Sequence, residues 1–73
     1  MPPRAHLISS LPSTRYRVMI PEGRAPQVGD LMQLDQGYTG ADGKPMVLAY
    51  GLDAEGRFIY EAEVYESEIG PDA

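Results

Sequence analysis

Two apolar segments joined by a short polar turn constrain the fold of this chain more than any other feature. Residues 45–52 and 57–64 flank the sequence Asp53-Ala-Glu-Gly56. A type I turn followed by a left-handed glycine connects antiparallel strands, so the two segments predict a β-hairpin. If Asp53 lies opposite Arg57, one face of the hairpin is wholly apolar, with the pairs Leu52–Phe58, Tyr50–Tyr60, Leu48–Ala62 and Met46–Val64.

Shorter patterns predict three further strands. Residues 15–20 alternate, with Tyr16, Val18 and Ile20 expected to face the core. Residues 28–36 predict a strand that ends in a glycine-rich loop at 37–44, and a change of period after Val64 predicts a bend and a short last strand. We therefore predict an all-β protein, an SH3-like five-stranded antiparallel barrel over residues 14–70. The alternative is an open, strongly bent antiparallel sheet that dimerises.

The chain is too short to hold more than one core, and it lacks the usual reinforcements of a small domain. Its 73 residues include no cysteine, which excludes disulfides and thiolate zinc sites. We expect self-association, with a homodimer as its simplest form, to add stability. Residues 1–13, rich in proline and serine, are expected to form a flexible leader, where His6 is a poor metal ligand, and residues 71–73 a tail. No apolar run is long enough for a membrane span or a signal peptide, so we expect a cytoplasmic protein.

The charges divide the chain into a basic beginning and an acidic remainder. The net charge of −5 combines +3 over residues 1–24 with −8 over residues 25–73. A protein that binds phosphates normally needs a basic surface, so nucleic acid is an unfavourable ligand for the acidic part. A basic partner would be attracted to it.

Tyrosines and glutamates are the residues most suggestive of a binding surface. Tyr38, in the expected loop, and Tyr65, at the expected bend, are the least obviously buried tyrosines, and a tyrosine beside acids is typical of protein interfaces. The densest acidic cluster consists of Glu61, Glu63, Glu66 and Glu68. A solvated strand face, paired with Arg15 and Arg17 of the first predicted strand, accounts for these glutamates without any chemistry. The candidate partner-binding residues are Tyr38, Tyr65, Glu61, Glu63 and Glu66.

Two segments resemble a known family. Gly29-Asp30-Leu-Met-Gln-Leu-Asp35 and Gly43-Lys44-Pro45-Met-Val-Leu48 resemble the opening of the MazF/PemK-type toxin ribonucleases, which have a Gly-Asp entry, a strand ending in Asp, and a basic residue and Pro before an apolar strand. The resemblance covers about 20 residues and implies a shared barrel geometry. Lys44 stands where such enzymes use arginine, so no catalytic residue is carried over.

Three functional hypotheses follow from these residues. The first is a small, non-enzymatic bacterial interaction module that binds a basic protein, an adaptor of the immunity-protein or antitoxin kind at its most specific. The alternative is a nucleic-acid-binding barrel that uses Arg4, Arg15, Arg17 and Arg24. The third is a metal- or small-ligand-binding protein that uses the glutamate-rich strand. No serine or threonine has an activating neighbour, so no catalytic residue, cofactor or metal site is predicted.

Overall fold

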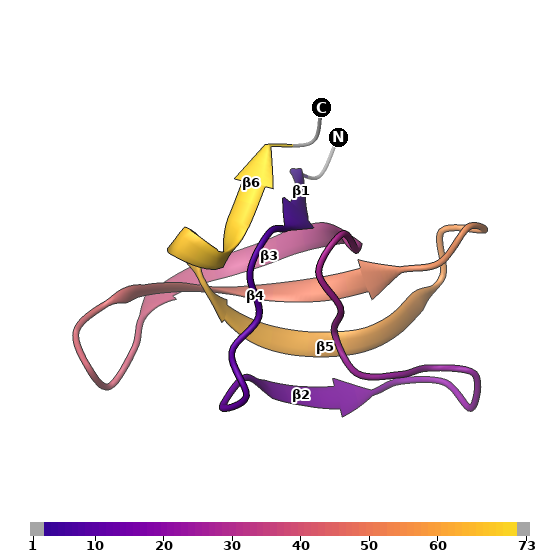
Figure 1. Ribbon diagram of the computed structural model, residues 1–73, viewed down its shortest axis with the longest axis horizontal. Helices are drawn as coiled ribbons and strands as arrows, with labels where there is room; N and C mark the ends of the chain where they lie inside the picture. Colours follow the sequence, from indigo (N-terminus) through magenta and orange to yellow (C-terminus); the bar gives the residue numbers. More distant parts are fainter. Residues whose placement is uncertain (1–2, 72–73) are drawn as a thin grey trace.

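The computed structural model describes residues 3–71, which form an all-β structure with no α-helix. Six strands make one antiparallel sheet in the order β2-β5-β4-β3-β1-β6 (Figure 1). The bounds are β1 Arg4–Leu7, β2 Arg15–Val18, β3 Leu31–Thr39, β4 Pro45–Leu52, β5 Phe58–Tyr65 and β6 Ile69–Pro71. A short 3₁₀ turn, η1 (Glu66–Glu68), separates β5 from β6.

The sheet is open, so the predicted SH3-like barrel is not confirmed. The strands β2 and β6 form its two edges and do not pair with each other. β5 curves strongly along its length in Figure 1, as in the alternative prediction of an open, bent sheet. The number of strands also differs from the prediction, because six are present rather than five.

The additional strand is β1, which lies in the segment expected to be a flexible leader. β1 pairs with β3 on one side and with β6 on the other, and its alternating residues Ala5 and Leu7 are buried. The prediction of a flexible leader is therefore wrong for residues 4–7. The sequence did not reveal this strand because an apolar alternation of only four residues between prolines and serines is too short to predict one. Pro71, assigned to the tail, is the last residue of β6. Residues 1–2 of the leader and 72–73 of the tail lie outside the described residues.

The hairpin between β4 and β5 has the predicted turn but a different register. Gly56 adopts a positive φ of 81°, the Asp53 amide donates to the Arg57 carbonyl, and Leu52 lies opposite Phe58. A bulge then shifts the pairing by one residue. The predicted pairs Tyr50–Tyr60, Leu48–Ala62 and Met46–Val64 are therefore wrong. The observed partners are Gly51–Tyr60, Tyr50–Glu61, Ala49–Ala62, Leu48–Glu63, Val47–Val64 and Met46–Tyr65.

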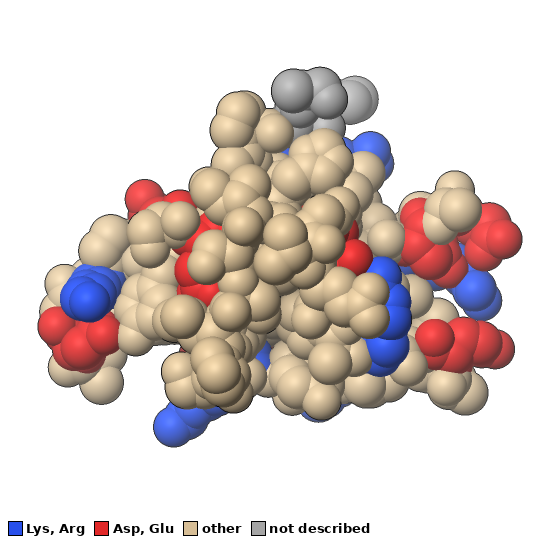
Figure 2. All heavy atoms as spheres, viewed as in Figure 1, with Lys and Arg blue, Asp and Glu red and all other residues tan. Residues whose placement is uncertain are grey.

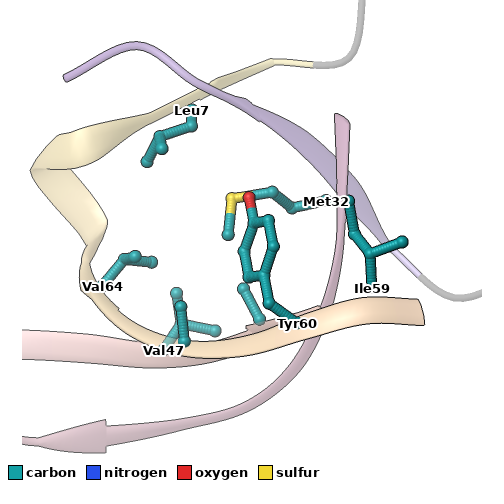
Figure 3. Close-up of a cluster of buried hydrophobic side chains, with 8 residues drawn as sticks. Leu7, Met32, Val47, Ile59, Tyr60 and Val64 are labelled. Carbon is teal, nitrogen blue, oxygen red and sulfur yellow. The ribbon is translucent and has the colours of Figure 1, made fainter. Parts of the chain in front are cut away.

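The register change decides which side chains form the core. The buried cluster, most of it drawn in Figure 3, consists of Leu7, Met32, Val47, Ala49, Ile59, Tyr60, Ala62 and Val64. Ile20, as predicted, packs against it. Tyr16 and Val18 lie opposite Ala62 and Tyr60 but remain 50% and 43% exposed, so their predicted burial is wrong. They belong to an edge strand and therefore have a neighbouring strand on one side only.

Connecting segments cross the sheet on the side seen in Figure 1. The backbone of the β2–β3 segment is tied to β5 where the Met19 amide donates to the Ile59 carbonyl. Figure 2 shows that the centre of this face carries few charged side chains and that most of the visible charges lie toward its rim. The core lies between this side of the sheet and its connections, so the opposite side of the sheet, called here the outer face, is where partly accessible side chains from several strands meet.

Candidate binding surface

The outer face is built from rows of directly opposed residues, because partners in an antiparallel pair project from the same side. One row runs from β3 through β4 to β5 as Tyr38, Met46 and Tyr65. A second contains Leu48, Glu63 and Arg15, and a third contains Arg4, Gln33, Tyr50, Glu61 and Arg17. The register shift of the β4–β5 hairpin therefore places methionine, leucine and tyrosine of β4 on the same face as the glutamates of β5.

Three tyrosines of this face each donate a hydrogen bond to a carboxylate. Tyr38 Oη lies 2.5 Å from Glu63 Oε1, and Tyr65 Oη lies 2.7 Å from Asp42 Oδ2. Tyr50 Oη lies 3.1 Å from Asp35 Oδ2, and its ring stacks on Phe58 with 4.7 Å between centroids. Each carboxylate therefore holds a phenol ring in a fixed orientation on the outer face.

All three phenols have raised pKa values, and each carboxylate contributes because ionisation of the phenol would place two negative charges side by side. The hydrogen bond to Glu63, with smaller effects of burial and charge, raises the pKa of Tyr38 to about 12. The hydrogen bond to Asp42 is the main cause of the raised pKa of Tyr65. For Tyr50, desolvation comes first and the hydrogen bond to Asp35 second. These rings are therefore neutral hydrogen-bond donors throughout the physiological range.

A pocket of about 380 Å³ lies at one end of the outer face. Its walls come from the segment before β2, from the β3–β4 loop and from the end of β5 with η1. Glu68 lines it and is only 4% exposed. One oxygen, Oε1, accepts the Tyr65 amide at 3.0 Å, whereas Oε2 has no hydrogen-bond partner among the described residues. The buried hydroxyl of Thr14, which also lines the pocket, has none either.

Three of the five predicted binding residues meet at this pocket. Tyr38, Glu63 and Tyr65 all line it. Glu61 lies in the next row, where Arg17 Nη2 contacts its Oε1 at 3.4 Å. Glu66 is exposed at the start of η1 and is not among the lining residues. The expected cross-strand pairing is confirmed, because Arg15 lies opposite Glu63 and Arg17 opposite Glu61.

Sequence reasoning missed Thr14, Asp42 and Glu68 as parts of this surface. Asp42 accepts the Lys44 amide, as a turn residue does, and its other oxygen accepts the hydroxyl of Tyr65. Glu68 was one of a run of glutamates. The available signal was its position three residues after the bend at Tyr65, since a glutamate there can reach back to the first amide of a short helical turn.

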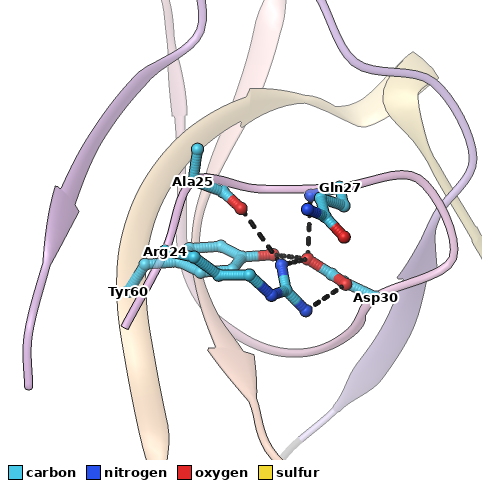
Figure 4. Close-up of polar contacts among 5 residues, drawn as sticks. All are labelled: Arg24, Ala25, Gln27, Asp30 and Tyr60. Carbon is cyan, nitrogen blue, oxygen red and sulfur yellow. Dashed lines mark hydrogen bonds and ion pairs between the residues drawn. The ribbon is translucent and has the colours of Figure 1, made fainter. Parts of the chain in front are cut away.

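Asp30 forms a second polar cluster, which supports the fold (Figure 4). Its carboxylate accepts two hydrogen bonds of 2.9 Å from Arg24, one of 2.9 Å from the Gln27 amide and one of 2.7 Å from Tyr60 Oη. Desolvation, the largest single effect, opposes ionisation of Asp30, but the hydrogen bonds together outweigh it and lower its pKa. Both oxygens are engaged by the chain itself, so the cluster holds the β2–β3 loop on β5 and leaves no acceptor oxygen unused.

The four arginines of the nucleic-acid hypothesis do not form one strip. Arg4 and Arg17 lie at opposite ends of a cross-strand row, four strand positions apart, with Glu61 between them. Arg24 is bound to Asp30. Within residues 3–71, no three histidine, aspartate or glutamate side chains are grouped so that they could hold a metal ion. No helix in this part of the chain is long and apolar enough to cross a membrane.

Comparison with known proteins gives no relative. A scan against protein-family models and searches of curated proteins and of solved structures found no match.

Proposed function

We propose that this chain is a small, non-enzymatic interaction module that binds a basic protein partner through the outer face. The observation that supports it best is the set of three tyrosine–carboxylate pairs on one side of the sheet. Tyrosines held in this way offer rigid apolar area at little entropic cost, which is the property that makes them frequent in interfaces. An adaptor of the immunity-protein or antitoxin kind is the most specific form of the proposal.

Charge supports a basic partner rather than an acidic one. Asp35, Asp42, Glu61 and Glu63 lie on or beside the tyrosine rings, and the chain carries a net charge of −5. Arg15 and Arg17 lie at the β2 edge of the face, where they oppose the two glutamates. Attraction over a Debye length speeds encounter with a cationic protein, whereas the tyrosines supply contact area after docking.

Charge reversal at two places on the molecule tests the proposal. The face variant combines Asp35→Lys with Glu61→Lys, and the control combines Glu22→Lys with Glu55→Lys in loops away from the outer face. Both change the net charge from −5 to −1, so a difference between them does not come from net charge. Each protein is used as bait in a cross-linking pull-down from the source organism, followed by calorimetry with the captured protein.

The proposal expects wild type and control to capture the same basic protein, and expects the face variant to bind it at least about tenfold more weakly, because close interfacial charge pairs contribute about 1.5 kcal/mol or more. Equal loss of binding in both variants would mean that the net charge of the chain, and not the outer face, determines the interaction. Failure of wild type to capture any protein would refute the proposal.

A further inference from the structure

The pocket at the end of the outer face has groups that the chain itself does not satisfy. Glu68 Oε2 and Thr14 Oγ1 are both buried and unpartnered. A buried acceptor without a donor destabilises the fold, and more so when it is charged. Unpartnered groups of this kind are uncommon in folded proteins, and a ligand in this pocket that carries several donors would satisfy both.

The charge of the lining selects a cation. Three carboxylates line the pocket, those of Asp42, Glu63 and Glu68, against the single guanidinium of Arg15. Two of them already hold the phenols of Tyr65 and Tyr38, so they cannot turn away from the pocket without breaking those bonds. An anion would be repelled by these carboxylates, whereas a cation would reduce the repulsion among them.

The remaining walls suit an alkyl chain that carries the charge. Leu11 and Met46 provide apolar surface, and the rings of Tyr38 and Tyr65 also line the pocket. Aromatic faces attract cations, and the chain's own Lys44 already lies with Nζ 5.9 Å from the centroid of Tyr65. A long aliphatic stem would pack on the apolar walls while its charged end reaches the buried acceptors.

We propose that this pocket receives a lysine side chain from the basic protein partner, with its ammonium donating to Glu68 and Thr14. This inference rests on the proposed function for the source of the lysine. An ammonium is compact and has three donors, which suits acceptor oxygens on two different residues, whereas a guanidinium is planar and suits a bidentate carboxylate. A volume of about 380 Å³ has room for a lysine side chain.

The test uses a probe that carries the lysine side chain alone. Nα-acetyl-lysine methylamide is titrated into isotope-labelled protein and followed by amide chemical shifts, with the norleucine analogue as the uncharged control. We expect saturable shifts at Thr14, Gly40, Tyr65 and Glu68 with a dissociation constant in the millimolar range, about −4 kcal/mol, and no such shifts with norleucine. Equal shifts with norleucine, shifts elsewhere, or no shift at about ten times that concentration would overturn the inference.

Two glutamates of η1 supply a matched pair of variants. Glu68→Gln keeps the shape of the side chain and the acceptor for the Tyr65 amide, and removes the charge; Glu66→Gln makes the same change at an exposed position outside the lining. We expect Glu68→Gln to weaken binding of the lysine probe at least tenfold and Glu66→Gln to leave its dissociation constant unchanged. Should Glu68→Gln fail to fold, Thr14→Val removes the other acceptor from a loop position. A variant that folds and binds as wild type contradicts the inference.

The outcomes separate this inference from the function on which it rests. Asp35 and Glu61, changed in the face variant, do not line the pocket. If the lysine probe binds but the face variant binds the partner as tightly as wild type does, the proposed function fails and the cation site stands. If partner capture depends on the outer face but the probe does not bind, only the lysine pocket fails. Tighter binding of the arginine analogue than of the lysine probe would overturn the assignment of lysine.

Discussion

The side chain of Asp30 joins the segment between β2 and β3 to β5. It accepts hydrogen bonds from Arg24, from the Gln27 amide and from Tyr60, thirty positions along the chain. We expect Asp30→Asn to lower the free energy of unfolding by about 1.5–3 kcal/mol, the usual worth of hydrogen bonds to a charged group. Urea unfolding measures it. Asp35→Asn, which alters an exposed carboxylate with one bond from Tyr50, is the control and should cost less.

The contribution of Asp30 should depend on pH in one direction. Its pKa is lowered in the folded state, so its stabilisation is complete above the unfolded value of about 3.9 and is lost as the pH falls through the folded pKa. The difference in stability between wild type and Asp30→Asn should therefore be largest near neutral pH and shrink below about pH 4. Urea unfolding of both proteins across this range measures it, and a difference that stays constant would contradict the expectation.

Tyr38 should titrate in the opposite sense. Its pKa is raised to about 12 chiefly by the hydrogen bond to Glu63, so its contribution is present below the ordinary value near 10 and is lost as the pH rises through the folded value. We expect Glu63→Gln to bring the pKa of Tyr38 back toward 10, measured by the ¹³Cζ shift of the ring. Glu61→Gln, in the row next to that of Glu63, is the control and should leave the pKa of Tyr38 unchanged. If Glu63→Gln also leaves it unchanged, the hydrogen bond is not the cause.

At the scale of the elements, the β4–β5 register depends on a glycine beneath a tyrosine. A β-carbon added at Gly51 would overlap the ring of its cross-strand partner Tyr60, which is fully buried and cannot move aside. We expect Gly51→Ala to cost about 1–3 kcal/mol of unfolding free energy, as overpacking of a core does. Gly37→Ala in the neighbouring strand β3 is the control, because the nearest atom to its β-carbon would be 3.7 Å away. Equal effects of the two substitutions would contradict the packing argument.

This glycine also explains why the hairpin was predicted only in part. The Asp53–Gly56 turn follows from local conformational preference, which a sequence displays directly. The bulge after it depends on the fit of Tyr60 over Gly51, a contact between strands that alternation alone does not reveal. The extra residue of the bulge reverses which side chains of β4 face the core, so Leu48 and Tyr50, predicted to be in the core, lie on the outer face.

At the scale of the whole molecule, the features that the sequence did not predict are those that depend on partners far away along the chain. β1 was missed because its place between β3 and β6 comes from partners 25 or more positions away, whereas the break after Tyr65 and the short strand β6 were anticipated from a change of period. The sequence could group Tyr38, Glu63 and Tyr65, which line one pocket, because tyrosines near acids are visible in it. Glu68 and Thr14 were missed because their burial is a property of the assembled pocket.

The distribution of charge over the whole molecule leads to an expectation about nucleic acids. Phosphate binding needs several cations on one continuous surface, because each contact releases counterions and the affinity grows with their number. Here Arg4 and Arg17 are at opposite ends of a row that contains Glu61, and Arg24 is held by Asp30. We therefore expect no gel shift of single-stranded DNA or RNA at about 10 μM protein and low salt, where non-specific binders are usually detected.

A basic nucleic-acid-binding protein run in parallel shows that the assay detects weak complexes. The informative contrary result would be a shift that weakens steeply with added salt and disappears in an Arg15→Gln, Arg17→Gln variant. That pattern would mean that the two cations at the β2 edge bind phosphate despite the glutamates opposite them, and the outer face would then be a nucleic-acid surface rather than a surface for a basic protein.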